Sequence, residues 1–401
     1  MPDFFTVAEI EKFRGDTPGC AHVVHFNHSG SSLMPQQVVD AVDAHTLLEA
    51  KIGGYEAYDA ALERIEDVYG SIARMLNASP SEIALVENAT RAWDMAFYAI
   101  PFNPGDVILT SVSEYASNVI SFLQIAKRGV TVEVVPNDEH GQISIEALGS
   151  MLDSRVKLVA VTHMPTNGGL VQPAAAVGVL ARENGSFFLL DACQTAGQMP
   201  LDVEALQCDF LSATSRKFLR GPRGVGFLFV RDDVIEQLEP PMLDLHAAEW
   251  TSADGYRIRP DAKRFENWEK NYANHLGMGA AVDYALEVGL DRIWTQVERN
   301  AARLRDTLSA IPGVTVHDLG EVKGGIVTFE VDGIEPPAVN KQLRSKWRIN
   351  TSGSGVASTR FDMESRGIEN LVRSSTHYFT TDDEIDLLST AVEEIRLGSP
   401  W

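Results

Sequence analysis

Short apolar runs alternate with longer amphipathic stretches through the middle of the chain, from about residue 82 to residue 192. The apolar runs are continuous and rich in Val, Ile and Leu, which is typical of strands buried on both faces. The stretches between them have the apolar spacing of helices. The expected strands are EIALVEN, DVILTSV, VTVEVVP, KLVAVTHMP and SFFLLDA. Strands that alternate with helices predict a mainly parallel sheet with helices on both faces.

Beyond this region the pattern changes twice. DFLSATS and VGFLFV follow with only a loop between them, which allows one antiparallel strand in the sheet. A long helical pattern then covers residues 276–311, and the remainder is typical of a compact α+β unit. We therefore predict an α/β protein with a large domain at 25–275 and a smaller C-terminal α+β domain at 276–401. Residues 1–24 are expected to pack near the smaller domain.

Composition places the chain among ordinary globular proteins. Of its 401 residues, 44% are hydrophobic and 22% are charged, and 34 Lys and Arg face 56 Asp and Glu, a net charge of −22. This charge disfavours binding to nucleic acid or an anionic membrane, because each phosphate contact has to overcome repulsion. No apolar run approaches the roughly eighteen residues of a membrane span, and the acidic N-terminus is unlike a signal peptide. We therefore expect a cytoplasmic protein.

Neither cysteines nor histidines indicate a metal or disulfide site. Cys20, Cys193 and Cys208 are odd in number and widely spaced, which disfavours a disulfide framework and a Cys-ligated zinc. The segment HVVHFNH, residues 22–28, repeats histidine every three residues. On a strand this spacing points successive rings to opposite faces, so we expect no metal.

Polar residues gather where the expected strands end. In an open parallel sheet, ligands bind at the carboxyl ends of strands, where helix N-termini supply donors for anions. The segments at these ends are 88–90, 113–115, 163–167, 191–194 and 214–217. Together they offer a phosphate cup, an aromatic ring, a carboxylate and a lysine. Pyridoxal 5′-phosphate requires this set: a lysine for an imine, a carboxylate for the pyridine nitrogen, phosphate donors and an aromatic partner.

Two motifs carry a family resemblance. LLDACQTAGQMPLDV and DFLSATSRKFLRGPRGVGFLFV, with Lys217 placed 26 residues after Asp191, resemble the class V aminotransferase family of fold-type I pyridoxal phosphate enzymes. That family contains cysteine desulfurases, isopenicillin N epimerase-like proteins and hercynylcysteine sulfoxide lyases. The resemblance extends from HFNHSGSSLMP to LVRSSTHYFTTDDEIDLL, which is most of the chain. It implies the fold-type I architecture, bound pyridoxal 5′-phosphate, an amino-acid substrate and a homodimer with shared active sites.

The resemblance also implies roles for individual residues. Lys217 in TSRK matches the imine-forming lysine, Asp191 in LLDACQ matches the partner of the pyridine nitrogen, and Tyr115 in SEYASN replaces a ring-stacking histidine. These three are the expected catalytic residues. Further residues expected to bind the cofactor are Ala89, Thr90, Asn167, Gln194, Thr214, Arg216 and Tyr272. Thr166 remains an alternative to Asn167, because the register of THMPTNGG is not fixed.

Two arginines are expected to bind the substrate. Arg373 in LVRSS matches the arginine that holds the α-carboxylate, a task that suits bidentate guanidinium geometry. A structural ion pair is the alternative for this residue. Arg223 in GPRG is either solvated or meets a second anionic group of the substrate.

The chain departs from the family pattern at two places. Desulfurases have a nucleophilic cysteine on a loop of the small domain, but the matching stretch, residues 349–368, contains none, and no cysteine follows Cys208. A persulfide-forming desulfurase is therefore not expected. The family's threonine that reaches the partner subunit's phosphate is also missing. Asn271 or Tyr272 could replace it, and we expect Tyr272.

The expected chemistry begins at the substrate's Cα, where Lys217 is the natural base. The segments EYASN, PTNGGLVQP and SRKFLRGPRG resemble sulfoxide lyases and epimerase-like members more than desulfurases. We therefore favour carbon–sulfur β-elimination from a cysteine-derived substrate, with an aminotransferase or an amino-acid epimerase as the alternative. An inactive scaffold is disfavoured, because Lys217, Asp191 and Arg373 are all present.

Overall fold

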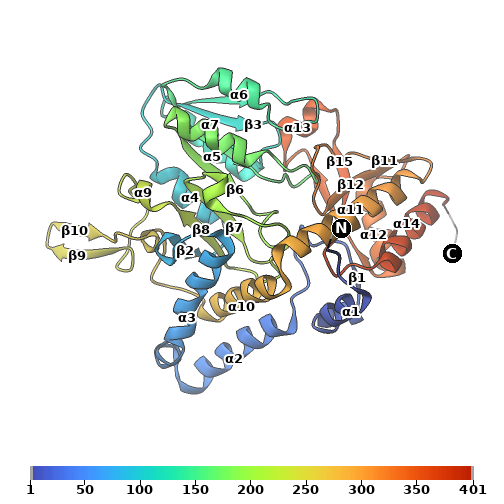
Figure 1. Ribbon diagram of the computed structural model, residues 1–401, viewed down its shortest axis with the longest axis horizontal. Helices are drawn as coiled ribbons and strands as arrows, with labels where there is room; N and C mark the ends of the chain where they lie inside the picture. Colours follow the sequence, from blue (N-terminus) through green and yellow to red (C-terminus); the bar gives the residue numbers. More distant parts are fainter. Residues whose placement is uncertain (1–2, 399–401) are drawn as a thin grey trace.

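The computed structural model describes residues 3–398, and its centre is a seven-stranded sheet in the order β2-β8-β7-β6-β5-β3-β4 (Figure 1). Neighbouring strands are parallel except around β8, which is antiparallel to both β2 and β7. This confirms the mainly parallel sheet and its antiparallel member. The strands are β2 (Ile83–Val86), β3 (Val107–Ser111), β4 (Thr131–Val135), β5 (Val156–Thr162), β6 (Phe187–Asp191), β7 (Phe210–Thr214) and β8 (Gly226–Val230).

Helices cover both faces of this sheet, which explains why its strands are continuously apolar. On β6, Phe188 and Leu190 join one hydrophobic cluster, whereas Phe187 and Leu189 join another on the opposite face. The first face is covered by α3 (Gly54–Leu76), α6 (Ile145–Met151), α7 (Ala174–Asn184), α8 (Val203–Leu206) and α10 (Tyr272–Val288). The second is covered by α4 (Ala89–Ala99), α5 (Ala116–Ala126), α9 (Asp232–Ile235) and η3 (Ala262–Phe265).

A second sheet lies in the C-terminal part of the chain and has its own hydrophobic cluster. Its order is β11-β12-β15-β14 and all its pairs are antiparallel. Its strands are β11 (Val314–Val316), β12 (Ile326–Val331), β14 (Ser352–Gly355) and β15 (Asn370–Ser375), and the helices are α11 (Leu290–Ser309), α12 (Pro336–Trp347), α13 (Arg360–Ser365) and α14 (Asp382–Arg396). In Figure 1 these elements gather at the end of the molecule opposite the hairpin β9 (Ala248–Ser252) and β10 (Gly255–Ile258).

The two parts are joined through α10 and α11. Helix α10, which contains residue 276, packs on α2 (Gln36–Ile52) and α3, whereas α11 packs on α14 and β11. Gly289, with φ of 92°, separates the two helices. The division of the chain at 275/276 stays a prediction, and the packing of α10 favours a later boundary, near Gly289.

The N-terminal segment packs on the C-terminal part. It contains α1 (Val7–Gly15), η1 (Pro18–Ala21) and β1 (Val24–His25), and η2 (Pro80–Glu82) follows later in the chain. Arg14 of α1 pairs with Glu384 of α14 at 2.8 Å, and Glu9 pairs with Arg292 of α11 at 2.9 Å. Strand β1 pairs in parallel with β13 (Ile349–Asn350).

Two glycines allow the strand-end loops to approach one another. Gly197 has φ of 90°, and a Cβ there would lie 2.4 Å from Leu219 Cα, so the loop after β6 and the loop after β7 touch through backbone. At Gly226 of β8 a Cβ would lie 2.5 Å from Ala213 O and 3.3 Å from Ala89 N. The start of α4 therefore lies directly against β8 and β7.

Candidate active site

One cavity, of about 220 Å³, lies where the carboxyl ends of the central strands meet the N-termini of α4 and α5. Every strand-end segment predicted to face a common cleft contributes to its wall. The segment 113–115 contributes only Tyr115. The lining residues are Asn88, Ala89, Thr90, Tyr115, Asn118, Thr162, Met164, Thr166, Asp191, Cys193, Gln194, Thr214, Arg216 and Lys217.

Lys217 lies on the loop between β7 and β8 and lines the cavity. Its amine makes no hydrogen bond or ion pair with another described residue. Burial lowers the pKa of Lys217, which favours the neutral amine. The loop is held from two sides, because the N–H of Ser32 donates to Arg216 O at 2.8 Å and His377 Nε2 contacts Phe218 O at 2.9 Å.

Asp191 is the last residue of β6 and is only 5% exposed. The Cys193 N–H donates to Asp191 Oδ1 at 2.9 Å, and Asn118 Nδ2 donates to Oδ2 at 3.2 Å. Both donors are neutral, and no lysine or arginine of the described residues forms an ion pair with this carboxylate. A buried carboxylate without a cationic partner is costly, so a protonated nitrogen of a ligand would stabilise it.

The start of α4 provides donors for an anion. Asn88 caps the helix by accepting a hydrogen bond from the N–H of Arg91 at 2.9 Å. The N–H groups of Ala89 and Thr90 have no acceptor within the helix and lie at its positive end. Arg216 lines the same cavity from the loop after β7 and donates to the carbonyl of Gly30. A phosphate would be stabilised by this arrangement.

Arg373 of β15 is 9% exposed and does not itself line the cavity, but it contacts the wall residue Thr166. Its Nε donates to Ser352 Oγ at 3.1 Å, and its Nη1 donates to the carbonyl at 3.1 Å and to the hydroxyl of Thr166, a wall residue. Burial lowers the pKa of Arg373 to about 10. The guanidinium pairs with no carboxylate of the described residues, so the structural ion pair considered for it is not observed.

Besides Arg373, which contacts the wall only through Thr166, three predicted site residues do not line this cavity. Asn167 is 2% exposed and donates to Asp362 Oδ2 at 2.6 Å, while Thr166 forms the wall in its place. Tyr272, the first residue of α10, lines a separate cavity and packs against a tyrosine of α3, with ring centroids 4.7 Å apart and ring planes tilted by 45°. Arg223 is exposed. The roles assigned to these residues stay predictions, and the geometry favours Thr166 over Asn167.

Two wall residues lie outside the strand-end segments named from the sequence, Asn118 and Thr162, and three lie within those segments but were given no role: Asn88, Met164 and Cys193. For Asn118 a signal existed, because it follows Tyr115 by three residues and so lies on the same face of α5. Thr162 pairs with Asp191 across neighbouring strands, a register that no local motif reveals.

The three cysteines are free thiols. Burial raises the pKa of Cys193, of Cys20 and of Cys208, the last to about 12. Because the thiolate is the nucleophilic form, all three are held in the less reactive state. Among residues 3–398, no group of histidine, cysteine or carboxylate side chains is arranged to hold a metal ion, and no helix is both long and apolar enough to cross a membrane.

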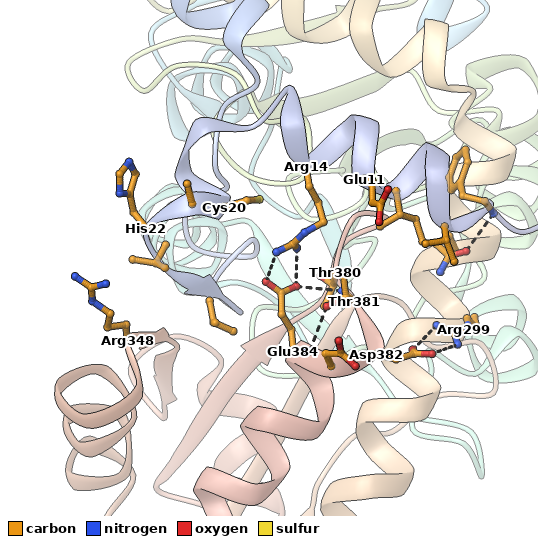
Figure 2. A pocket seen from close by; sticks show the side chains of 18 of the residues that line it. Glu11, Arg14, Cys20, His22, Arg299, Arg348, Thr380, Thr381, Asp382 and Glu384 are labelled. Carbon is orange, nitrogen blue, oxygen red and sulfur yellow. Dashed lines mark hydrogen bonds and ion pairs between the residues drawn. The ribbon is translucent and has the colours of Figure 1, made fainter.

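A larger cavity, of about 880 Å³, lies between α1, η1 and the start of α14 (Figure 2). Its charged side chains mostly pair with one another: Arg14 donates to Glu384 at 2.8 Å, and Arg299 donates to Asp382 at 2.6 Å. These groups are already satisfied, unlike those at the strand ends. We therefore take the smaller cavity as the candidate active site.

Comparison with known proteins agrees with this assignment. The family model "Aminotransferase class-V" matches residues 24–388. A probable cysteine desulfurase of Methanothermobacter thermautotrophicus is 30% identical over 390 residues, 96% of this chain and 98% of its own. The apo structure of a cysteine desulfurase from Thermococcus onnurineus NA1 matches with a TM-score of 0.91 and 26% identity, over the whole of both chains. A cystine C–S lyase in complex with its product cysteine persulfide shares the fold, with a TM-score of 0.84 and 24% identity over 94% of this chain and 99% of its own.

Proposed function

Because the chain belongs to the class V aminotransferase family, and is a pyridoxal 5′-phosphate (PLP) enzyme, we propose that it is a carbon–sulfur β-lyase. Its substrate is a cysteine-derived α-amino acid, and no persulfide forms on the enzyme. The names of its relatives, cysteine desulfurase and C–S lyase, support sulfur chemistry. One observation separates it from a desulfurase: residues 349–368 contain no cysteine, and burial raises the pKa of each thiol the chain has.

The cavity fits PLP because several polar groups of its wall have no partner within residues 3–398, and PLP carries the complementary groups. Asp191 has no cation, and Gln194 Oε1 is buried without a hydrogen-bond partner among the described residues. The amine of Lys217 is unpaired, and the N–H groups of Ala89 and Thr90 have no acceptor within the helix and could donate to an anion. Asp191 would hold the ring nitrogen, Gln194 the phenolic oxygen and Lys217 the aldehyde carbon. The phosphate would be held by Ala89, Thr90, Thr214 and Arg216.

When bound, PLP supplies an electron sink for the pair released at the substrate's Cα. Asp191 would keep a proton on the ring nitrogen, because its buried negative charge would stabilise a positive nitrogen beside it. Arg373 holds the α-carboxylate, with Thr166 fixing the guanidinium. Tyr115, which lines the cavity, would lie along the ring.

The neutral amine of Lys217 takes the Cα proton, because its lowered pKa leaves more of the residue able to accept one. The electron pair from the Cα–H bond then forms the Cα–Cβ double bond as the Cβ–S bond breaks. The sulfur group leaves with the electron pair of the Cβ–S bond. Hydrolysis of the remaining three-carbon fragment gives pyruvate and ammonia. No residue has to attack sulfur, so the reaction needs no cysteine.

We further propose a homodimer in which Tyr272 reaches the partner's cavity. Large apolar side chains on α2 and α3, beside the helix that begins with Tyr272, are solvent-exposed in the single chain: Leu47, Ile52, Tyr55 and Leu62. Burial of such side chains is the driving force of association. Light scattering should report a dimer, whereas a monomer with full PLP occupancy would contradict this arrangement.

The test is to incubate the PLP-loaded protein with S-substituted cysteines and ordinary amino acids, with and without a keto-acid acceptor. A lyase releases pyruvate and a free sulfur product in equal amounts without acceptor. The triple variant Cys20→Ala, Cys193→Ala, Cys208→Ala should retain this activity. Keto acid that forms only with an acceptor would establish an aminotransferase, and loss of optical rotation without pyruvate an epimerase. A persulfide on the wild-type protein, lost with activity in the triple variant, would establish a desulfurase.

A further inference from the structure

A second carboxylate lies directly behind the cavity. Glu114, between β3 and α5, is 1% exposed. Its Oε1 accepts from the N–H of Tyr115 and from Asn118 Nδ2, each at 2.8 Å, and from the hydroxyl of Thr162. Its Oε2 accepts from Thr110 Oγ1 and from the N–H of Thr162, each at 3.1 Å. All these donors are neutral, so this carboxylate has no ion pair and does not line the cavity.

One amide group joins this carboxylate to the cavity. Asn118 Nδ2 donates to Glu114 Oε1 at 2.8 Å and to Asp191 Oδ2 at 3.2 Å. Asn118 lies on the first turn of α5, where its side chain is 2% exposed. An amide held by two carboxylates has one rotamer that satisfies both, so Glu114 fixes the direction from which Asn118 approaches Asp191.

The same carboxylate also fixes the aromatic wall. Tyr115 is the N-cap residue immediately before α5, and its N–H donates to Glu114, which helps to fix the backbone that carries the Tyr115 side chain to the cavity. Glu114 therefore contacts two residues of the cavity wall at once: Tyr115, which is expected along the ring, and Asn118, which donates to Asp191.

We propose that Glu114 is a positioning residue that acts on the bound cofactor through Asn118 and Asp191. The inference rests on the proposed role of Asp191. The negative charge of Glu114 adds to that of Asp191, and both charges favour the protonated form of the ring nitrogen. Glu114 therefore raises the pKa of that nitrogen. Glu114 neither touches the substrate nor transfers its proton.

The surroundings of Glu114 allow its charge to change near neutral pH. Burial raises the pKa of Glu114 to about 7, against the opposing hydrogen bonds from Thr162 and Asn118, and the charge of Asp191 raises it further. The titratable groups on the elements packed around it are Asp191 from β6 and the Tyr115 phenol from α5. Strands β3 and β5 present the hydroxyls of Thr110 and Thr162.

The experiment compares Glu114→Gln, Glu114→Asp and Asn118→Ala with the wild-type holoenzyme. Asp209→Asn is the control, because Asp209 is a half-buried carboxylate whose pKa burial raises, to about 6, and it accepts from the N–H of Phe188 at the other end of β6. The readouts are kcat, KM, the pH titration of the bound cofactor's absorbance, and thermal unfolding. Loss of an outer partner of a functional group typically costs on the order of ten- to a hundredfold in activity.

We expect Glu114→Gln to lower kcat about tenfold with KM changed less than threefold, because Arg373 still holds the carboxylate. The pH midpoint of the absorbance should move to lower pH. Asn118→Ala should show the same shift, and the double variant should be no worse than either single variant. Glu114→Asp, which keeps the charge, should recover part of the shift. Asp209→Asn should alter only thermal unfolding.

A wild-type titration midpoint and kcat in Glu114→Gln would overturn the inference. If Glu114→Gln does not fold, the same outcome in Glu114→Asp together with Asn118→Ala overturns it. Failure of the proposed function is distinguishable, because it shows in the wild type as absence of pyruvate. Failure of the Asp191 role shows in Asp191→Ala as an unchanged absorbance titration, whatever Glu114 does.

Discussion

Replacing Arg373 by methionine should separate what this residue does for the fold from what it does for the substrate. Methionine is also long and flexible but carries no charge. Burial lowers the pKa of Arg373 from 12.5 to about 10, which corresponds to about 3 kcal/mol against the buried charge. Because the unfolded chain binds this proton more tightly, the cost is fully present below pH 10 and at neutral pH.

The variant also gives up the hydrogen bonds to Ser352 and Thr166, each worth about 1 kcal/mol. The two contributions nearly cancel, so the free energy of unfolding of Arg373→Met without substrate should lie within about 2 kcal/mol of wild type. Substrate binding should suffer much more. Loss of a desolvated charge pair costs about 2–5 kcal/mol, which raises KM by about 30-fold to several thousandfold.

The assay combines urea denaturation with binding of an α-amino acid and of the amine that lacks its carboxylate. Wild type should prefer the acid, and Arg373→Met should bind both alike. The control is Arg231→Met: Arg231 is equally buried but pairs with Glu204 at 2.8 Å, so this variant should lose stability and keep its KM. Retained preference for the acid in Arg373→Met, or destabilisation of more than about 4 kcal/mol, would refute the reasoning.

Three further predictions follow from the same residues. Borohydride should fix PLP covalently on Lys217, as mass spectrometry would show; an adduct on another lysine would contradict the site. Asp191→Ala should bind PLP but lose at least about 2 kcal/mol of transition-state stabilisation, so that kcat falls more than 30-fold; near-normal turnover would mean that another group holds the ring. The free energy of unfolding should fall between pH 6.5 and pH 5, because five histidines that are neutral in the folded chain become charged when it unfolds, at about 1.4 kcal/mol per histidine and pH unit. The raised pKa values of Glu114 and Asp209 partly oppose this loss. An unchanged urea midpoint over this pH range would contradict the prediction. Those histidines are His25, His28, His163, His275 and His377.

The sequence predicts those features of the site that depend on periodicity and on strand ends. Asp191 ends one short apolar run and Lys217 follows another, the alternation with helices favours buried strands for both, and parallel strands bring their carboxyl ends to one edge. It does not settle which of two adjacent residues faces inward. Thr166 and Asn167 lie in a loop without period, and their directions are fixed by distant partners: Arg373 for Thr166 and Asp362 for Asn167.

Glu114 was passed over for a different reason. A glutamate before a helix is usually a solvated residue, and its local sequence does not reveal burial. Burial arises because Thr110 and Thr162, from neighbouring strands, close over it, and that pairing is a property of the assembled sheet. The domain boundary depends in the same way on tertiary packing. The helical pattern from residue 276 is visible in the sequence, but the sequence does not reveal that the first half of this pattern packs on α2 and α3.

Several polar groups without a partner in the described part of the chain gather at the candidate active site, and this distribution indicates where a ligand binds. At the cavity of α1 and α14, arginines and carboxylates satisfy one another, which stabilises the fold and leaves little for a ligand. Around the candidate active site, Asp191 and Arg373 are buried and Lys217 is half-buried, and none of the three forms an ion pair with another described residue. Burial of the Arg373 charge costs about 3 kcal/mol, which its hydrogen bonds to Ser352 and Thr166 only offset. A fold retains such groups where a ligand completes them. The positive ring nitrogen and the phosphate of PLP, and the carboxylate of an amino acid, are the complements that these three residues and the start of α4 lack.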